Sequence, residues 1–128
     1  MKCRNTLLLA CLFGLAACTT APIYTVTDAP VVVMAGKQAS TEDVRDAILR
    51  AGNRLGWQMV PAEPGVINAK LSLRNHVAMV DVRYSATSYS IVYRDSTNLE
   101  HRGDQIHNND NGWIQNLDRD IRNELLYR

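Results

Sequence analysis

The stretch that decides the fold is 67–93, INAKLSLRNHVAMVDVRYSATSYSIVY. Apolar and polar residues alternate along it in three runs, which is the pattern of β-strands with one buried face and one solvated face. The side chains expected to face the core are Ile67, Ala69, Leu71, Leu73, Ala78, Val80, Val82, Tyr84, Tyr89, Ile91 and Tyr93. The connections at 75–76 and 85–87 are short, so the stretch predicts an antiparallel meander.

Apolar residues at helical spacing flank the meander on both sides. Ser40 and Asp43 form a capping-box pair before the first such segment, and Gly56 stands where a left-handed residue would end it. Its expected buried face comprises Val44, Ala47, Ile48, Ala51 and Leu55. A second helix is expected from Trp113 to the end of the chain, with a buried stripe of Ile114, Leu117, Ile121 and Leu125. Asn111 is the residue expected to cap this second helix.

A run of β-branched residues, Val31-Val32-Val33-Met34-Ala35, reads as a buried strand before the first helix. A short strand is also expected at 57–60, ahead of a turn at 61–65. Stacking two helices on the apolar face of the sheet buries both layers. The sequence therefore predicts an α+β two-layer sandwich, mainly antiparallel, in β-α-β-β-β-α order with both helices on one face.

The first 17 residues have the layout of a secretory signal peptide. Lys2 and Arg4 give a positive start, and the apolar run that follows, 7–17, is too short to span a bilayer, which takes roughly 20 residues. The run ends in Leu15-Ala16-Ala17-Cys18. This tetrapeptide resembles the lipobox of bacterial lipoproteins, in which the signal is cut before the cysteine and that cysteine carries the lipid.

The resemblance implies a diacylglyceride thioether on Cys18, with a further acyl group such as palmitate on the new amino terminus. Thr19, in place of an aspartate, resembles lipoproteins sorted to the outer membrane of Gram-negative bacteria, where the domain would face the periplasm. The expected organisation is a cleaved signal at 1–17, a lipidated tether at 18–30 and a single domain at 31–128. The alternative for the tether is that 23–26 pairs as an edge strand.

Cleavage before Cys18 removes 17 of the 128 residues and leaves 111, enough for one small domain. Cys3 and Cys11 leave with the signal, so no disulfide is expected. The mature chain keeps 12 basic and 13 acidic residues, and this balance lacks the charge excess of a generic nucleic-acid binder. No motif for a catalytic nucleophile, a zinc protease or a phosphate-binding loop is present, so neither an enzyme nor a cofactor is expected.

The polar face of the meander is the candidate binding face. Lys70, Arg74, Arg83 and Arg94 are expected to project from it, with Asp81 as the acid among them. Such a face suits an envelope protein with an acidic surface, an anionic glycolipid or an anionic glycan. The alternative is a solvated face with an arginine–aspartate pair that needs no ligand. The sequence leaves the oligomeric state open.

The competing interpretation places function in the polar stretch 95–112, which is expected to be a long loop. His101 and His107 share it with Glu100, Asp104 and Asp110, a possible ligand set for a divalent metal without the usual spacing. Positions 107, 109, 111, 112 and 118 also match the spacing of an EF-hand calcium loop, but with His first and Asp last. The functional hypotheses are thus a non-enzymatic binding or assembly accessory on the membrane, a small-ligand or metal-binding lipoprotein and, third, a hydrolase whose site has no sequence motif.

Overall fold

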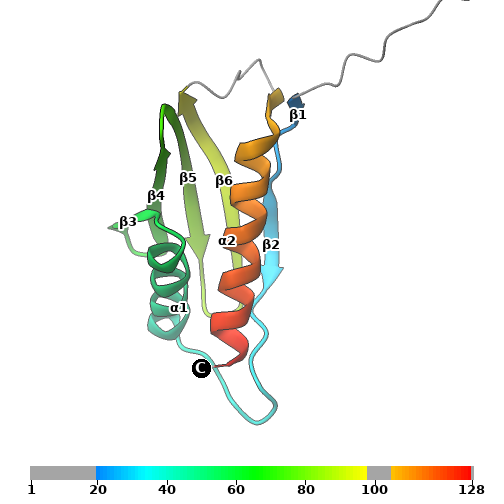
Figure 1. The fold of residues 1–128 in the computed structure, drawn as a ribbon. Coiled ribbons are helices and arrows are strands. Elements are labelled where there is room, and N and C mark those ends of the chain that lie inside the picture. The colour runs from blue at the N-terminus through cyan, green and yellow to red at the C-terminus, as the bar shows by residue number, and fades with distance from the viewer. Residues whose placement is uncertain (1–19, 98–104, 128) are drawn as a thin grey trace, which may run out of the picture.

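The computed structural model describes residues 20–97 and 105–127 and has the α+β architecture that the sequence predicts (Figure 1). Its elements are β1 (Thr20–Pro22), β2 (Val26–Pro30), α1 (Thr41–Arg54), β3 (Gln58–Glu63), β4 (Val66–Leu73), β5 (His76–Tyr84), β6 (Ser88–Thr97), β7 (Gln105–His107) and α2 (Asn108–Leu126). Five antiparallel strands form the main sheet in the order β2-β6-β5-β4-β3, and β1 pairs with β7 in a separate small sheet. Both helices lie on the same face of the main sheet (Figure 1).

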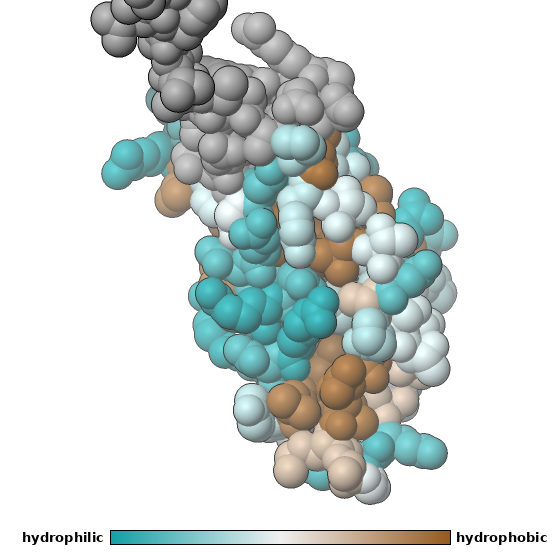
Figure 2. Space-filling view, turned by 90° about the vertical axis from the view of Figure 1, so that its right-hand side faces the viewer, coloured by the Kyte–Doolittle hydropathy of each residue, from teal (hydrophilic) through white to brown (hydrophobic). Residues whose placement is uncertain are grey.

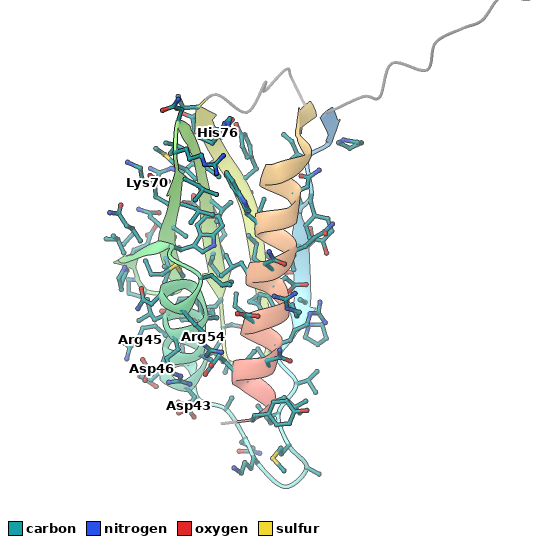
Figure 3. All side chains as sticks on the ribbon, viewed as in Figure 1. Asp43, Arg45, Asp46, Arg54, Lys70 and His76 are labelled. Atoms are coloured by element: carbon teal, nitrogen blue, oxygen red, sulfur yellow. The ribbon has the colours of Figure 1, made fainter. Side chains whose placement is uncertain are left out.

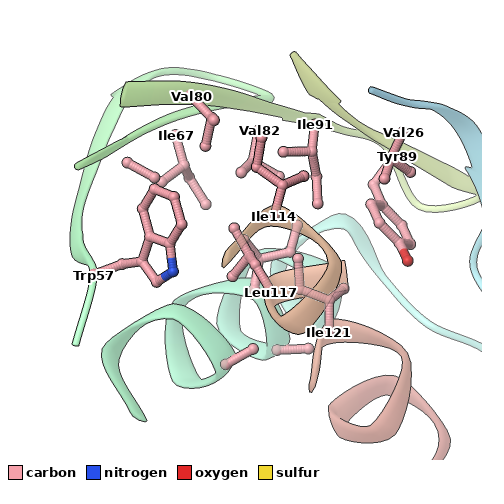
Figure 4. Close-up of a cluster of buried hydrophobic side chains, with 14 of the residues drawn as sticks. Val26, Trp57, Ile67, Val80, Val82, Tyr89, Ile91, Ile114, Leu117 and Ile121 are labelled. Atoms are coloured by element: carbon pink, nitrogen blue, oxygen red, sulfur yellow. The ribbon is translucent and has the colours of Figure 1, made fainter. Parts of the chain in front are cut away.

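The core lies between the sheet and the helices (Figure 4). Ile67, Val82 and Ile91 reach it from the strands, and Ile114 and Ile121 reach it from α2. All five are fully buried. The alternation in the meander is therefore confirmed, with one exception: Leu73 was expected in the core and is half exposed at the end of β4.

Helix α1 begins and ends where its capping residues predict. The Ser40 hydroxyl accepts from the Asp43 amide at 3.1 Å, and the Asp43 carboxylate accepts from the Ser40 amide at 2.9 Å. Gly56 has a φ of 88°, the left-handed conformation that ends many helices. Arg50 and Arg54 of α1 both pair with Glu124 of α2, which joins the two helices across their solvent side.

The first strand of the main sheet is β2, and the prediction of a strand at 31–35 is wrong. Pro30 stands opposite Ser88, where the partner strand β6 begins, and the Val31 amide makes a last bond to the Thr87 carbonyl at 2.9 Å. Beyond this point no partner strand remains, so the valine run leaves the sheet despite its β propensity. Val32 and Met34 are about half exposed, and Figure 2 shows apolar surface gathered at this end of the molecule.

The segment predicted to be a tether, 18–30, contains β1 and β2, so the boundary placed at residue 31 falls too late. Asn111 holds this segment against α2: its side-chain oxygen accepts from the Tyr24 amide at 2.8 Å, and its amide group donates to the Pro22 carbonyl at 2.7 Å. Asn111 thus lies inside α2 rather than capping it, because the helix begins at Asn108 instead of Trp113.

Both edges of the main sheet are irregular. On β2, Asp28 has a φ of 48° and the register shifts between Val26 and Ala29. On β3, Pro61 lies beside a second register shift. A proline lacks the amide hydrogen that a neighbouring strand needs, and a bulge turns the edge away from a flat pairing geometry.

A polar network ties α2 to β6 within the apolar core. The Tyr89 hydroxyl donates to Asp118 Oδ1 at 2.5 Å, and Arg122 Nε donates to both carboxylate oxygens at 3.2 Å. Tyr89 and Asp118 are both buried. Asp118 and Arg122 pair across one turn of α2, whereas the bond to Tyr89 joins residues 29 positions apart in the chain.

Alkaline pH is expected to weaken this network. Burial raises the pKa of Tyr89 above its ordinary value of 10.0, and the hydrogen bond and negative charge of Asp118 act in the same direction. The folded state therefore keeps a proton that the unfolded chain releases near pH 10, so the stabilisation is complete below that pH and is lost as pH rises toward the raised pKa. In urea unfolding between about pH 9 and pH 11, the free energy of unfolding should fall, and Tyr89→Phe should flatten the fall. An equal fall in Tyr89→Phe and in the control Tyr127→Phe, at an exposed position, would refute this assignment.

Candidate functional site

The candidate site is the open face of the main sheet, the face turned away from α1 and α2. We define this open face by the outward-pointing residues of β3 to β6: Gln58, Val60, Asn68, Lys70, Met79, Asp81, Arg83, Val92, Arg94 and Asp95. None of the described helices or strands covers it (Figure 1). Val60 is 57% exposed at its edge. Apolar and charged groups are therefore presented together on this face of the sheet.

The strand register arranges this face in cross-strand rows. One row runs from Gln58 through Lys70 and Met79 to Asp95. The next row runs from Val60 through Asn68 and Asp81 to Val92. Side chains directly opposite one another on antiparallel strands lie within contact distance, so each row forms a continuous strip.

A bulge in β6 places Arg94 over these rows. The register shifts between Met79 and Val80, so that Val80 stands opposite Tyr93 while Met79 stands opposite Asp95. Arg94 is the extra residue and has no counterpart on β5. Bulges commonly redirect a side chain in this way, and Arg94 Nε here lies 3.9 Å from Asp81 Oδ1.

A hollow of about 260 Å³ opens between the rows, and Lys70 is one of its lining residues. Figure 3 labels Lys70 at the sheet. The residues that line the hollow are Gln58, Val60, Asn68, Ala69, Lys70, Met79 and Arg94. Two cations and two carboxamides thus surround a short apolar surface. This chemistry suits a partner that offers an acidic group next to an apolar one.

Asp81 contributes an unsatisfied acceptor to the same face. Its Oδ1 atom is buried and, among the described residues, accepts no hydrogen bond, since Arg94 Nε at 3.9 Å is too distant to donate. A buried acceptor without a donor carries a desolvation cost, which the nearby positive charge of Arg94 offsets in part.

The four predicted cations do not form one cluster. Lys70 and Arg94 border the same hollow, whereas Arg83 lines a separate polar hollow of about 360 Å³ near Asp28 and Ser90. Arg74 was expected on the strand and instead lies in the β4–β5 turn, with a φ of 56°. The turn falls at 74–75, one residue earlier than predicted, because Leu73 pairs with His76 at the last position of the ladder.

The sequence did not reveal the contribution of Gln58 and Asn68, or the unsatisfied oxygen of Asp81. Asp95 was also missed as a second acid on the open face, because the bulge that places it there has no marker such as glycine. The Arg94–Asp81 pair, expected as the alternative for this face, is present at 3.9 Å.

The described residues of the alternative site at 95–112 form strand and helix instead of the expected loop. Asp95 to Thr97 end β6, and 105–107 form β7 before α2 begins. Glu100, His101 and Asp104 lie outside the described residues, as does Cys18. An EF-hand loop is contradicted, because positions 108–118 are helical and Asp118 is already bonded to Tyr89 and Arg122. Within 20–97 and 105–127, no group of three His, Cys, Asp or Glu residues lies close enough to hold a metal.

No protein-family model matches the chain, and neither a curated protein nor a solved structure matches it. Among the described residues, neither helix is long and apolar enough to cross a bilayer.

Proposed function

We propose that this chain is an envelope lipoprotein, anchored through Cys18, that acts as a non-enzymatic binding or assembly accessory. In this role it holds a small domain at the outer membrane, facing the periplasm, and binds a partner through the open face of its sheet. The observation that carries the proposal is the hollow bordered by Lys70 and Arg94 on a sheet face that the described helices leave uncovered. The lipobox at 15–18 supports the anchor.

The charges of the open face favour an acidic partner. Lys70 and Arg94 line the hollow, whereas the two acids of the open face, Asp81 and Asp95, do not, although Asp81 lies 3.9 Å from Arg94. A carboxylate or phosphate of the partner would pair with these cations. Val60 and Val92, both exposed on this face, would add apolar contact. An envelope protein with an acidic patch meets both requirements and is the partner we propose.

The proposed anchor is tested by the intact mass of protein extracted from its native host. We expect a chain that begins at Cys18 and carries a diacylglyceride and an acyl group. Cys18→Ser should abolish the added mass and release the protein from membranes, because several acyl chains give essentially permanent attachment. An unmodified thiol, or a start downstream of Cys18, would rule the anchor out.

The proposed interaction is tested in cells with a photo-crosslinking residue that replaces Val92 on the open face. The comparison places the same residue at Gln115, on the exposed side of α2. We expect position 92 to capture one dominant envelope protein, and Lys70→Gln with Arg94→Gln to reduce this product at least tenfold. The control carries the same charge change on the helix side, Arg45→Gln with Arg119→Gln, and should leave the product unchanged. Equal capture from positions 92 and 115, or an equal loss in the control, would contradict the proposal.

A further inference from the structure

The tip of the β4–β5 hairpin exposes an apolar side chain next to a basic one. Leu73 is 51% exposed, although its place in the alternation of β4 points it to the helical side of the sheet. Leu71, the previous residue on that side, is buried. Arg74 follows in the turn. The hairpin thus extends past its core-forming residues and ends in a leucine and an arginine.

The backbone at this tip does not favour arginine. Arg74 has a φ of 56°, a conformation that glycine or asparagine adopts much more readily in two-residue hairpin turns. Local folding therefore does not account for a long basic side chain at this position, and its presence indicates a role for the side chain itself.

The hairpin tip lies at the same end of the molecule as the amino-terminal segment (Figure 1). The register gives the same result: Val77, near the tip, pairs with Thr97 at the end of β6, and β2 runs antiparallel to β6, away from this end. Residues 20–25 precede β2 and therefore lie toward the tip. The apolar loop at 31–39 lies at the opposite end (Figure 1).

Only a short segment of chain separates the residues that Asn111 binds from the proposed lipid on Cys18. Its side chain fixes the Pro22 carbonyl and the Tyr24 amide. Four residue steps separate Cys18 from Pro22, and they extend to about 14 Å at most. A lipid on Cys18 therefore holds this end of the domain close to the bilayer surface.

We propose that Leu73 and Arg74 form a second membrane contact, in which Leu73 enters the interface and Arg74 pairs with phosphates of anionic phospholipids. The proposal rests on the lipid anchor at Cys18. Both charge and position favour lipid as the occupant, because phospholipid phosphates complement arginine and the leaflet lies within reach of this end. The strands then stand upright on the membrane, and the Lys70–Arg94 hollow faces sideways, accessible to a partner.

The test uses the lipidated protein, purified from its host and reconstituted in vesicles of phosphatidylethanolamine and phosphatidylglycerol. A fluorophore is attached to an introduced Ser72→Cys near the tip or Ala35→Cys at the opposite end. The lipobox cleavage removes Cys3 and Cys11, and the lipid occupies Cys18, so the introduced thiol is the one that reacts. We expect headgroup-labelled quencher lipids to quench the label at position 72 and not the label at position 35.

Arg74→Gly should reduce the quenching of the label at position 72 by about fivefold, because it removes one cation from contact with an anionic surface. Replacing phosphatidylglycerol with phosphatidylcholine should have a similar effect, and Leu73→Ser should also reduce contact. Glycine suits the φ of this turn, so the melting temperature of Arg74→Gly should not fall. Arg83→Gln, which removes one charge near the end of β5 that is far from the tip, is the matched control and should not alter quenching.

Vesicle flotation separates the two proposals. If the protein floats with the vesicles but position 72 is quenched no more than position 35, or Arg83→Gln acts as strongly as Arg74→Gly, the tip contact is refuted and the anchor stands. If the protein does not float, both proposals are refuted.

Discussion

Ile121→Asp is expected to unfold the domain. Ile121 is fully buried on α2, among the side chains that the helix presents to the sheet (Figure 4). A carboxylate placed there without a partner costs several kcal/mol, and domains of this size are stable by about 5 to 15 kcal/mol in total. Circular dichroism should show no cooperative melting above room temperature, or a melting temperature lowered by about 20 °C or more.

The comparison for Ile121→Asp is Gln115→Asp, on the exposed side of the same helix. It introduces the same charge and should change the free energy of unfolding by no more than about 0.5 kcal/mol. Ile121→Val, which keeps the site apolar, should cost about 1 kcal/mol. Normal melting of Ile121→Asp would mean that α2 does not pack as described.

Asp118→Ala is expected to cost about 2 to 3 kcal/mol, because it leaves the Tyr89 hydroxyl buried without its acceptor. Tyr89 is 1% exposed, so water cannot replace the lost bond without rearrangement of the core. The Arg122 side chain is about half exposed and should contribute little to the loss. Thermal melting should show a decrease of about 10 °C or more.

Two further variants isolate the hydrogen bond. Asp118→Asn keeps an oxygen that accepts from Tyr89 and should cost less than Asp118→Ala. Tyr89→Phe removes the donor as well, so the double variant Tyr89→Phe with Asp118→Ala should cost less than the two single effects added together. Strict additivity would show that the two side chains do not act as a pair in solution.

The layers of the fold were predictable because each depends on a local pattern. The meander at 67–93 follows from alternation, and α1 follows from its apolar spacing and from the capping pair of Ser40 and Asp43. The first strand was not predictable. Three consecutive valines have high β propensity, but β6 begins opposite Pro30 and offers them no further partner.

The start of α2 was missed for a related reason. Asn111 and Gly112 resemble a helix boundary, since both are poor helix formers. In the structure, two bonds from Asn111 to the backbone of Pro22 and Tyr24 stabilise it inside the helix. Such contacts join residues nearly 90 positions apart, and no local pattern encodes them.

The sequence predicted which face of the sheet carries the candidate site, but it did not predict how the side chains are arranged on that face. Alternation placed Lys70, Arg83 and Arg94 outward, and all three are exposed. The bulge that brings Arg94 toward Asp81 depends on the pairing of β5 with β6, and the turn that removes Arg74 from the strand depends on the exact hairpin register. Both are set by the assembled sheet.

The irregular edges of the sheet have a consequence under the membrane anchor proposed above. Anchoring concentrates copies in two dimensions, where lateral collisions become frequent and exposed strand edges could template fibrillar aggregation. Pro61 on one edge and the twisted backbone at Asp28 on the other interrupt the row of donors and acceptors that such growth requires. Anchored copies crowded in a leaflet would therefore meet without joining their sheets, leaving the open face of each available to the proposed partner.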